Sequence, residues 1–121
     1  MSTLYQIVGS KRLTPRKLIK ASWSLTDFVI IARPSHMGLA GKRVDGCDMR
    51  ICNVEQFLAA VEKQHSIGLR YCGNWCWLYA NNPRTGYVTG FEVFGQLQNN
   101  IVPFLEWLNV NGIEYKSEHD E

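Results

Sequence analysis

The chain has 121 residues, of which 45% are hydrophobic and 20% are charged, with a net charge of +2. This composition is ordinary for a soluble globular protein, and the length predicts one domain with a core of its own. No apolar run approaches the ~20 residues of a membrane-spanning helix, and the first residues lack a secretory pattern, so we expect a cytoplasmic protein with no membrane contact.

The charge is unevenly distributed along the chain. Residues 1–60 carry nine Lys/Arg and four Asp/Glu, a balance of +5, whereas residues 61–121 carry four and seven, a balance of −3. Five basic residues and no acidic residue lie between positions 11 and 20. The final residues 116–121 are acidic, and we expect this tail to fray.

The first part of the chain predicts a strand, a helix and a second strand. Residues 3–8 have a strand-like pattern. Thr14 followed by Pro15 is typical of a helix start, with the helix ending near Ser22. Residues 28–32 form a continuous apolar run, which is typical of a strand buried on both faces. Pro34 is expected to end that strand, and residues 37–41 to form a loop.

The middle of the chain predicts an interrupted strand followed by a helix. Residues 42–52 are strand-like except at Asp45-Gly46, which predicts either a tight turn or a bulge. Gln56 lies three residues after a capping Asn53, so we expect a helix over residues 54–64. Its apolar stripe comprises Val54, Phe57, Leu58 and Val61.

The last part predicts three strands, a helix and a closing strand. Strands are expected over 67–71 and 75–79 around a Gly73-Asn74 turn, and, after a loop at 81–86, over 87–94. A helix is expected from near Asn100 to residue 110, with Pro103 in its first turn and Gly112 after its end. Its stripe comprises Ile101, Phe104, Leu105 and Leu108, and residues 113–116 form a short strand. This order predicts an α+β fold, a mainly antiparallel sheet with about three helices packed on it.

The four cysteines do not have the spacing of a zinc site. Cys47 and Cys52 are five residues apart, Cys72 and Cys76 are four apart, and zinc knuckles usually space their sulfurs as C-x2-C. We therefore expect reduced thiols that pack as small hydrophobic side chains, with no metal and no cofactor. A zinc site and a disulfide are the less favoured alternatives.

No catalytic motif stands out, so we expect that the protein is not an enzyme. The chain has neither a nucleophile elbow nor a Walker glycine pattern. His36, in a predicted loop near Gly38 and Gly41, has the best location for chemistry. A small enzyme or sensor that uses His36 and a cysteine is the remaining enzymatic alternative.

The basic segment gives the strongest binding signal. It comprises Lys11, Arg12, Arg16, Lys17 and Lys20. Arg16 and Lys17 lie where the helix dipole disfavours cations, and the sequence offers no nearby acid, so an external phosphate would relieve the repulsion. A basic face that is merely solvated is the alternative interpretation.

The aromatic strand is the second candidate. Alternation places Trp75, Trp77 and Tyr79 on one face and Cys76, Leu78 and Ala80 on the other. The aromatic face would either stack bases or contact a protein partner. The simpler expectation is that helix 54–64 or helix 101–110 covers it.

We therefore expect a small non-enzymatic binding or inhibitor module that engages a nucleic acid or a nucleic-acid-handling protein. The expected binding residues are those of the basic segment together with Trp75 and Trp77. Size and the missing catalytic signature are typical of phage and plasmid accessory proteins, including those that block a host defence nuclease complex. The alternative is a protein–protein interaction domain that uses the aromatic strand or the acidic C-terminal half.

Overall fold

The computed structural model of the chain describes residues 2–25, 28–37, 41, 43–71, 74–80, 82–94 and 101–119. At residues 2, 35–37, 43–45, 71, 74, 75, 94 and 119 it describes the backbone alone. The predicted turn residue Gly73, the helix start at Asn100 and most of the loop expected at 37–41 lie outside the described residues.

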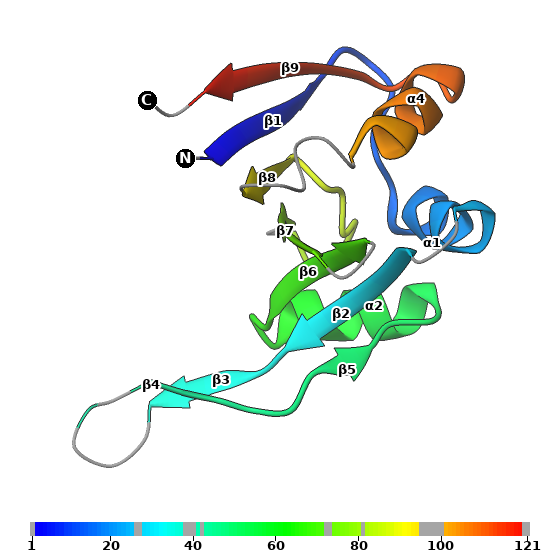
Figure 1. The fold of residues 1–121 in the computed structure, drawn as a ribbon. Helices are drawn as coiled ribbons and strands as arrows, with labels where there is room; N and C mark the ends of the chain where they lie inside the picture. The colour runs from blue at the N-terminus through cyan, green and yellow to red at the C-terminus, as the bar shows by residue number, and fades with distance from the viewer. Residues whose placement is uncertain are drawn as a thin grey trace.

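Seven strands form one antiparallel sheet in the order β5-β2-β6-β7-β8-β1-β9 (Figure 1). The strands are β1 (Ser2–Val8), β2 (Phe28–Arg33), β5 (Met49–Arg50), β6 (Ser66–Tyr71), β7 (Asn74–Tyr79), β8 (Gly90–Phe94) and β9 (Glu114–His119). The first strand, β1, therefore lies between the last two, β8 and β9, so the two ends of the chain are joined in one sheet. A separate pair, β3 (Ser35–Met37) and β4 (Arg43–Asp45), extends away from the helices (Figure 1).

Three described helices complete an α+β fold, as predicted. They are α1 (Pro15–Ser24), α2 (Val54–Glu62) and α4 (Val102–Val110). The predicted caps are confirmed: the Thr14 side chain accepts from the Lys17 amide at 3.2 Å, and the Asn53 side chain accepts from the Gln56 amide at 2.9 Å. Because these caps satisfy amides that have no partner within a helix, they fix where α1 and α2 begin.

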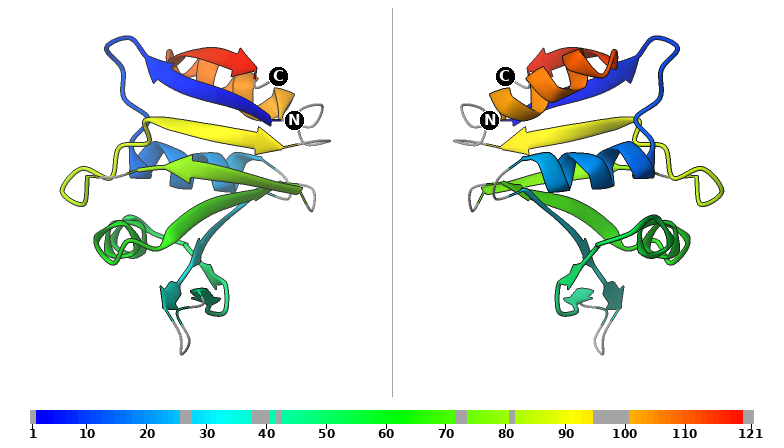
Figure 2. Two further views of the ribbon diagram at one scale, coloured as in Figure 1. Left: turned by 90° about the vertical axis from the view of Figure 1, so that its left-hand side faces the viewer. Right: turned by 90° about the vertical axis from the view of Figure 1, so that its right-hand side faces the viewer.

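One core cluster lies between the helices and a single face of the sheet. The sheet contributes alternate residues to this core, among them Leu69 of β6, Cys76 of β7 and Phe91 of β8. Figure 2 (left) views the sheet from the opposite face, with α1 and α4 behind the strands. The period of two along each strand therefore divides its side chains between a covered and an uncovered face.

Phe104 of α4 joins two distant strands within this core. Its ring centroid lies 5.3 Å from that of Phe28 in β2 and 5.4 Å from that of Phe91 in β8. Leu108, one turn later on the helix, is also fully buried, whereas Leu105 is only half-buried. The predicted apolar stripe of α4 is thus confirmed at Phe104 and Leu108, whereas Leu105 is less buried than predicted.

The interruption at Asp45-Gly46 is a bulge in a long hairpin. Between the pairs Ala32–Met49 and Ser35–Asp45 lie two residues on one arm, 33–34, and three on the other, 46–48. The Gly46 amide donates to the Pro34 carbonyl at 2.6 Å across this point. The extra residue confirms the bulge alternative and excludes a tight turn at this position.

Four predicted boundaries are wrong. Residues 116–119 do not fray but belong to β9, where Lys116 pairs with Gln6 and His119 with Thr3; residues 120 and 121 lie outside the described part. Asn74 is not a turn residue, because it pairs with Tyr71 within the sheet. The strand expected from residue 87 begins at Gly90, and α2 ends two residues before the expected position 64. At the terminus, pairing with the distant strand β1 overrides the local pattern.

Candidate functional site

The predicted binding residues lie on two opposite sides of the molecule. The basic segment lies on and before α1, which packs on the covered face of the sheet. The aromatic residues of β7 lie on the uncovered face, because their neighbours Cys76 and Leu78 point into the core. The structure therefore separates the two candidate surfaces, and each is described in turn.

One cation of the basic segment has a hydrogen-bond partner within the protein, and another lies close to the end of α4. The Lys17 ammonium group donates to the Arg12 carbonyl at 3.3 Å. The Lys11 side chain lies against Gly112, where an added Cβ atom would be 2.9 Å from its Nζ atom. Lys11 thus lies beside the C-terminal end of α4, where a cation is favoured. The expectation of no local compensation at Arg16 and Lys17 is wrong at Lys17, where the Arg12 carbonyl supplies some of it.

The remaining cations of α1 share one side of the helix with a tryptophan. Arg16, Lys20 and Trp23 are spaced by four and three residues, which places them on one side of an α-helix. All three are exposed, and Trp23 is 73% exposed. We call these residues the α1 stripe. Sequence reasoning missed Trp23, although the same helical spacing from Arg16 and Lys20 would have found it.

A hollow of about 230 Å³ lies beside the α1 stripe. Its lining combines the stripe with the floor residue Ile19 and with the residues at the start of α2, namely Cys52 before the helix, the N-cap Asn53 and the first helical residue Val54. Ile19 is buried and Val54 is half-buried, so the floor is apolar. The hollow therefore offers two cations, an indole ring and an apolar floor in one place.

Neither α2 nor α4 covers Trp77 and Tyr79 of β7, contrary to the simpler expectation. Trp77 is half-buried and Tyr79 is 39% exposed, and both lie opposite the core. The backbone of Trp75 follows the same alternation, while its side chain lies outside the described part. We call Trp77 and Tyr79, with Arg33, Asp48 and Glu92, the aromatic face.

Polar contacts hold the aromatic face in place. Arg33 donates to both carboxylate oxygens of Asp48, at 2.8 and 3.3 Å, and its guanidinium carbon lies 5.3 Å from the centroid of the Trp77 ring. The hydrogen bond from Arg33 holds the pKa of Asp48 below its usual range. The Tyr79 hydroxyl donates to Glu92 at 2.8 Å. Burial, followed by this bond to the Glu92 carboxylate, raises the pKa of Tyr79 to about 12.

Glycines shape the relief of this face. Gly68 pairs with Trp77, and Gly90 pairs with Tyr79, so each aromatic side chain has a neighbour without a side chain. A shallow hollow of about 440 Å³ lies over Gly90, and another of about 230 Å³ lies between His65 and Tyr79. Tyr79 therefore forms a ridge between two depressions, a relief suited to contact with another macromolecule.

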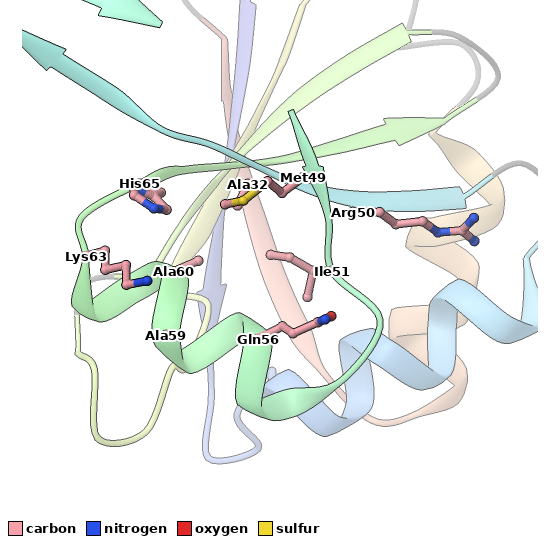
Figure 3. Close-up of a pocket in the computed structure, with 9 residues that line it drawn as sticks. All are labelled: Ala32, Met49, Arg50, Ile51, Gln56, Ala59, Ala60, Lys63 and His65. Carbon is pink, nitrogen blue, oxygen red and sulfur yellow. The ribbon is translucent and has the colours of Figure 1, made fainter. Parts of the chain in front are cut away.

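A further small hollow of about 170 Å³ lies between β5 and α2 (Figure 3). Ala32, Ile51 and Ala60 form its buried apolar part. Figure 3 shows Lys63 and His65 at one end, while the Arg50 side chain extends away. Ile51 lines this hollow, and the next residue in the chain, Cys52, lines the hollow beside the α1 stripe.

The cysteines and histidines do not form a recognisable reactive centre in the described part of the chain. Cys76 is buried, and burial raises the pKa of its thiol. Cys47 and Cys52 are exposed, so the expected packing as small hydrophobic side chains is wrong for both. Cys72 lies outside the described residues. Among the described residues, no three His, Cys, Asp or Glu side chains gather as metal ligands would.

His36 does not lie in a loop, as expected, but in β3, where it pairs with Val44. Its side chain and the neighbouring Gly38 lie outside the described part of the chain. His65 follows α2, and its amide donates to the Ala60 carbonyl at 3.0 Å.

Comparison with known proteins finds no matching family model, no similar curated protein and no similar solved structure. None of the helices in the described ranges combines the length and the apolar composition that crossing a bilayer requires.

Proposed function

We propose that the protein is a non-enzymatic binding module that engages a nucleic acid, or a nucleic-acid-handling protein, through the basic side of α1. The observation that carries the proposal is the α1 stripe, in which Arg16, Lys20 and Trp23 lie on one exposed side of a helix beside an apolar hollow. Phosphates pair with such cations, and aromatic rings stack on bases.

The electrostatics of α1 supports an anionic partner. Among the described residues, no ion pair within 4.0 Å joins Arg16 or Lys20 to an acidic side chain. The first turn of α1 contains no acidic residue, so nothing on the helix offsets the cations at its positive end. A polyanion would neutralise this charge and release its own counterions, which favours binding.

The test is a matched pair of charge reversals. Arg16→Glu with Lys20→Glu changes the α1 stripe, and Lys63→Glu with Arg84→Glu makes the same change of charge at exposed positions outside both candidate surfaces. Binding of fluorescent oligonucleotides is followed by anisotropy over a range of salt concentrations. We expect the first variant to lose affinity, with a log–log salt slope smaller by about two, one for each lost phosphate contact.

The control variant should keep a slope close to that of the wild type. Equal losses in both variants, or no binding of the wild type at low salt, would reject direct nucleic-acid binding through α1. A pull-down from host lysate with and without nuclease then tests the protein partner, because a nucleoprotein captured through its nucleic acid is lost after digestion. The roles as an inhibitor and as a cytoplasmic accessory protein stay predictions.

The aromatic face supports a second candidate, a protein–protein interaction. Trp and Tyr are enriched at binding hot spots, and here Trp77 and Tyr79 lie on a sheet face that no described helix covers. If this face binds the partner, Tyr79→Ala should abolish capture in the pull-down, whereas the double reversal on α1 should leave it unchanged.

A further inference from the structure

We propose that the hollow beside the α1 stripe holds an unpaired nucleotide, with its base stacked on Trp23 and the flanking phosphates beside Arg16 and Lys20. The inference rests on the proposed function and names the form of nucleic acid that the site takes, a single strand. Stacking on Trp23 would add an aromatic contact to a surface whose charge alone would bind any nucleic acid.

Trp23 has no visible role in the fold. The apolar side of α1 is already buried through Leu18, Ile19 and Ala21. Trp23 is the most exposed aromatic residue among the described side chains. An indole ring left in water gains from any partner that covers it, and a nucleobase covers it with a flat surface of matching kind.

The hollow has the size and lining for one base. Its volume of about 230 Å³ compares with the roughly 150 Å³ of an apolar cavity that accommodates benzene. Ile19 and Val54 supply apolar contacts for a ring. Trp23 comes from α1, whereas Cys52, Asn53 and Val54 come from the start of α2, so an inserted base would contact two elements.

Asn53 adds a polar group that can contact a base edge. Its side-chain oxygen accepts from the Gln56 amide at 2.9 Å, which fixes the orientation of the amide group. The NH2 group of the same side chain is not used in capping and carries two donors. It can therefore donate to a carbonyl oxygen on the edge of an unpaired base.

Stacking on Trp23 requires an unpaired base. In a duplex the faces of the bases are covered by their neighbours, and a side chain in a groove contacts only their edges. A single strand can turn a base outward while its phosphates follow the cations. Arg16 and Lys20 are on the same side of α1 as Trp23, as this arrangement requires.

The experiment measures the affinity of the full chain for three fluorescent probes: an oligodeoxythymidine, an oligouridine and a DNA duplex of the same length. Trp23→Ala should weaken binding of at least one single strand by about 5- to 150-fold, the loss expected for one stacked base. Trp23→Phe, which keeps an aromatic ring, should retain most of the affinity. Val110→Ala is the matched control, because it shortens another highly exposed apolar side chain on a different helix.

The duplex arm and the charge variants separate the inference from the proposed function. If Trp23→Ala leaves every affinity unchanged while the Arg16/Lys20 reversal weakens binding, the stacked base is refuted and nucleic-acid binding through α1 stands. An equal loss for single strands and duplex also refutes it. If the wild type binds none of the probes, the stacked base and direct nucleic-acid binding through α1 both fail, and the pull-down then tests the protein partner. Because Trp23 is exposed, its variants should melt at nearly the same temperature as the wild type.

Discussion

Arg33 lies over the ring of Trp77, with its guanidinium carbon 5.3 Å from the ring centroid, while the same group is bonded to Asp48. The contact joins the end of β2 to β7, with β6 between them in the sheet. It also places a cation on an aromatic surface, an attractive arrangement even at a partly exposed site. The side chains of the uncovered face thus hold one another in place.

Asp48→Asn should destabilise the protein at neutral pH and much less in acid. The Arg33 bond lowers the pKa of Asp48 in the folded state, so its stabilising effect is present above the ordinary aspartate pKa of about 3.9. The effect is lost as pH falls through the lowered folded-state pKa, where the carboxylate is protonated. Urea unfolding of both proteins across this range measures the difference. A difference independent of pH would contradict the role of the charge, and Glu106→Gln controls for removing an exposed carboxylate.

Tyr79 should titrate later than an ordinary tyrosine. Its pKa of about 12 lies above the usual value of about 10, so its contribution to folding stability is complete below pH ~10 and is lost as pH rises toward 12. The ultraviolet absorbance of tyrosinate, compared between wild type and Tyr79→Phe, isolates this residue. Glu92→Gln should move the titration to lower pH but not to the usual value, because burial is the larger cause. A titration in Glu92→Gln that is unchanged from the wild type would show that the charge of Glu92 does not contribute.

Leu108→Ala should cost about 2–5 kcal/mol of the free energy of unfolding, because the side chain is fully buried. Leu105→Ala on the same helix should cost clearly less, since Leu105 is only half-buried. Chemical denaturation measures both. Equal costs would mean that α4 presents a different side to the sheet.

Gly86→Ala should destabilise the protein more than Gly41→Ala. Both glycines have a left-handed backbone, with φ of +62° and +72°. A Cβ atom at Gly86 would lie 2.7 Å from side-chain atoms of both Leu58 and Pro15, whereas one at Gly41 would meet nothing within 4 Å. The overpacking should add about 1–3 kcal/mol to the backbone cost that the two variants share. Similar melting temperatures would show that α1 and α2 move apart at little cost.

Cys76 should resist thiol reagents in the native protein, whereas Cys47 and Cys52 should react quickly. Cys76 is buried, and burial raises the pKa of its thiol, so little of the reactive thiolate forms. The measurement is thiol titration in a Cys72→Ser background, which removes the cysteine outside the described residues. Denaturant should release the slow thiol. Equal rates for all three thiols without denaturant would contradict the burial of β7.

Most helices and strands could be predicted because their signals are local. Thr14 and Asn53 cap the helices that follow them, and Pro103 lies within the first turn of α4, as its fixed backbone angle allows. Boundaries that depend on partners were less accurate. Residues 116–119 have the composition of a frayed tail, yet β1 supplies hydrogen bonds that no sequence pattern at the terminus reveals.

The candidate site was predicted only in part, for the same reason. The cations Arg16 and Lys20 were found from their charge, but only the folded chain brings the Lys11 side chain near Gly112 at the end of α4. Trp23 was missed because its importance depends on exposure. The wall formed by residues 52–54 lies about thirty positions further along the chain, and only the packing of α2 beside α1 brings it to the hollow.

The sequence by itself determined where helices begin, which residues alternate along each strand and where basic residues concentrate. It did not determine which face of β7 the helices cover, because Trp77 and Tyr79 on one face and Cys76 and Leu78 on the other are all suited to a core. The register with which β7 pairs with β6 and β8 in the tertiary structure decides which face is covered. Pairing aligns Trp77 with Gly68 and Glu92, and Cys76 with Leu69 and Val93. The apolar neighbours of Cys76 make that face the one to bury, since a helix over Glu92 would remove a carboxylate from water.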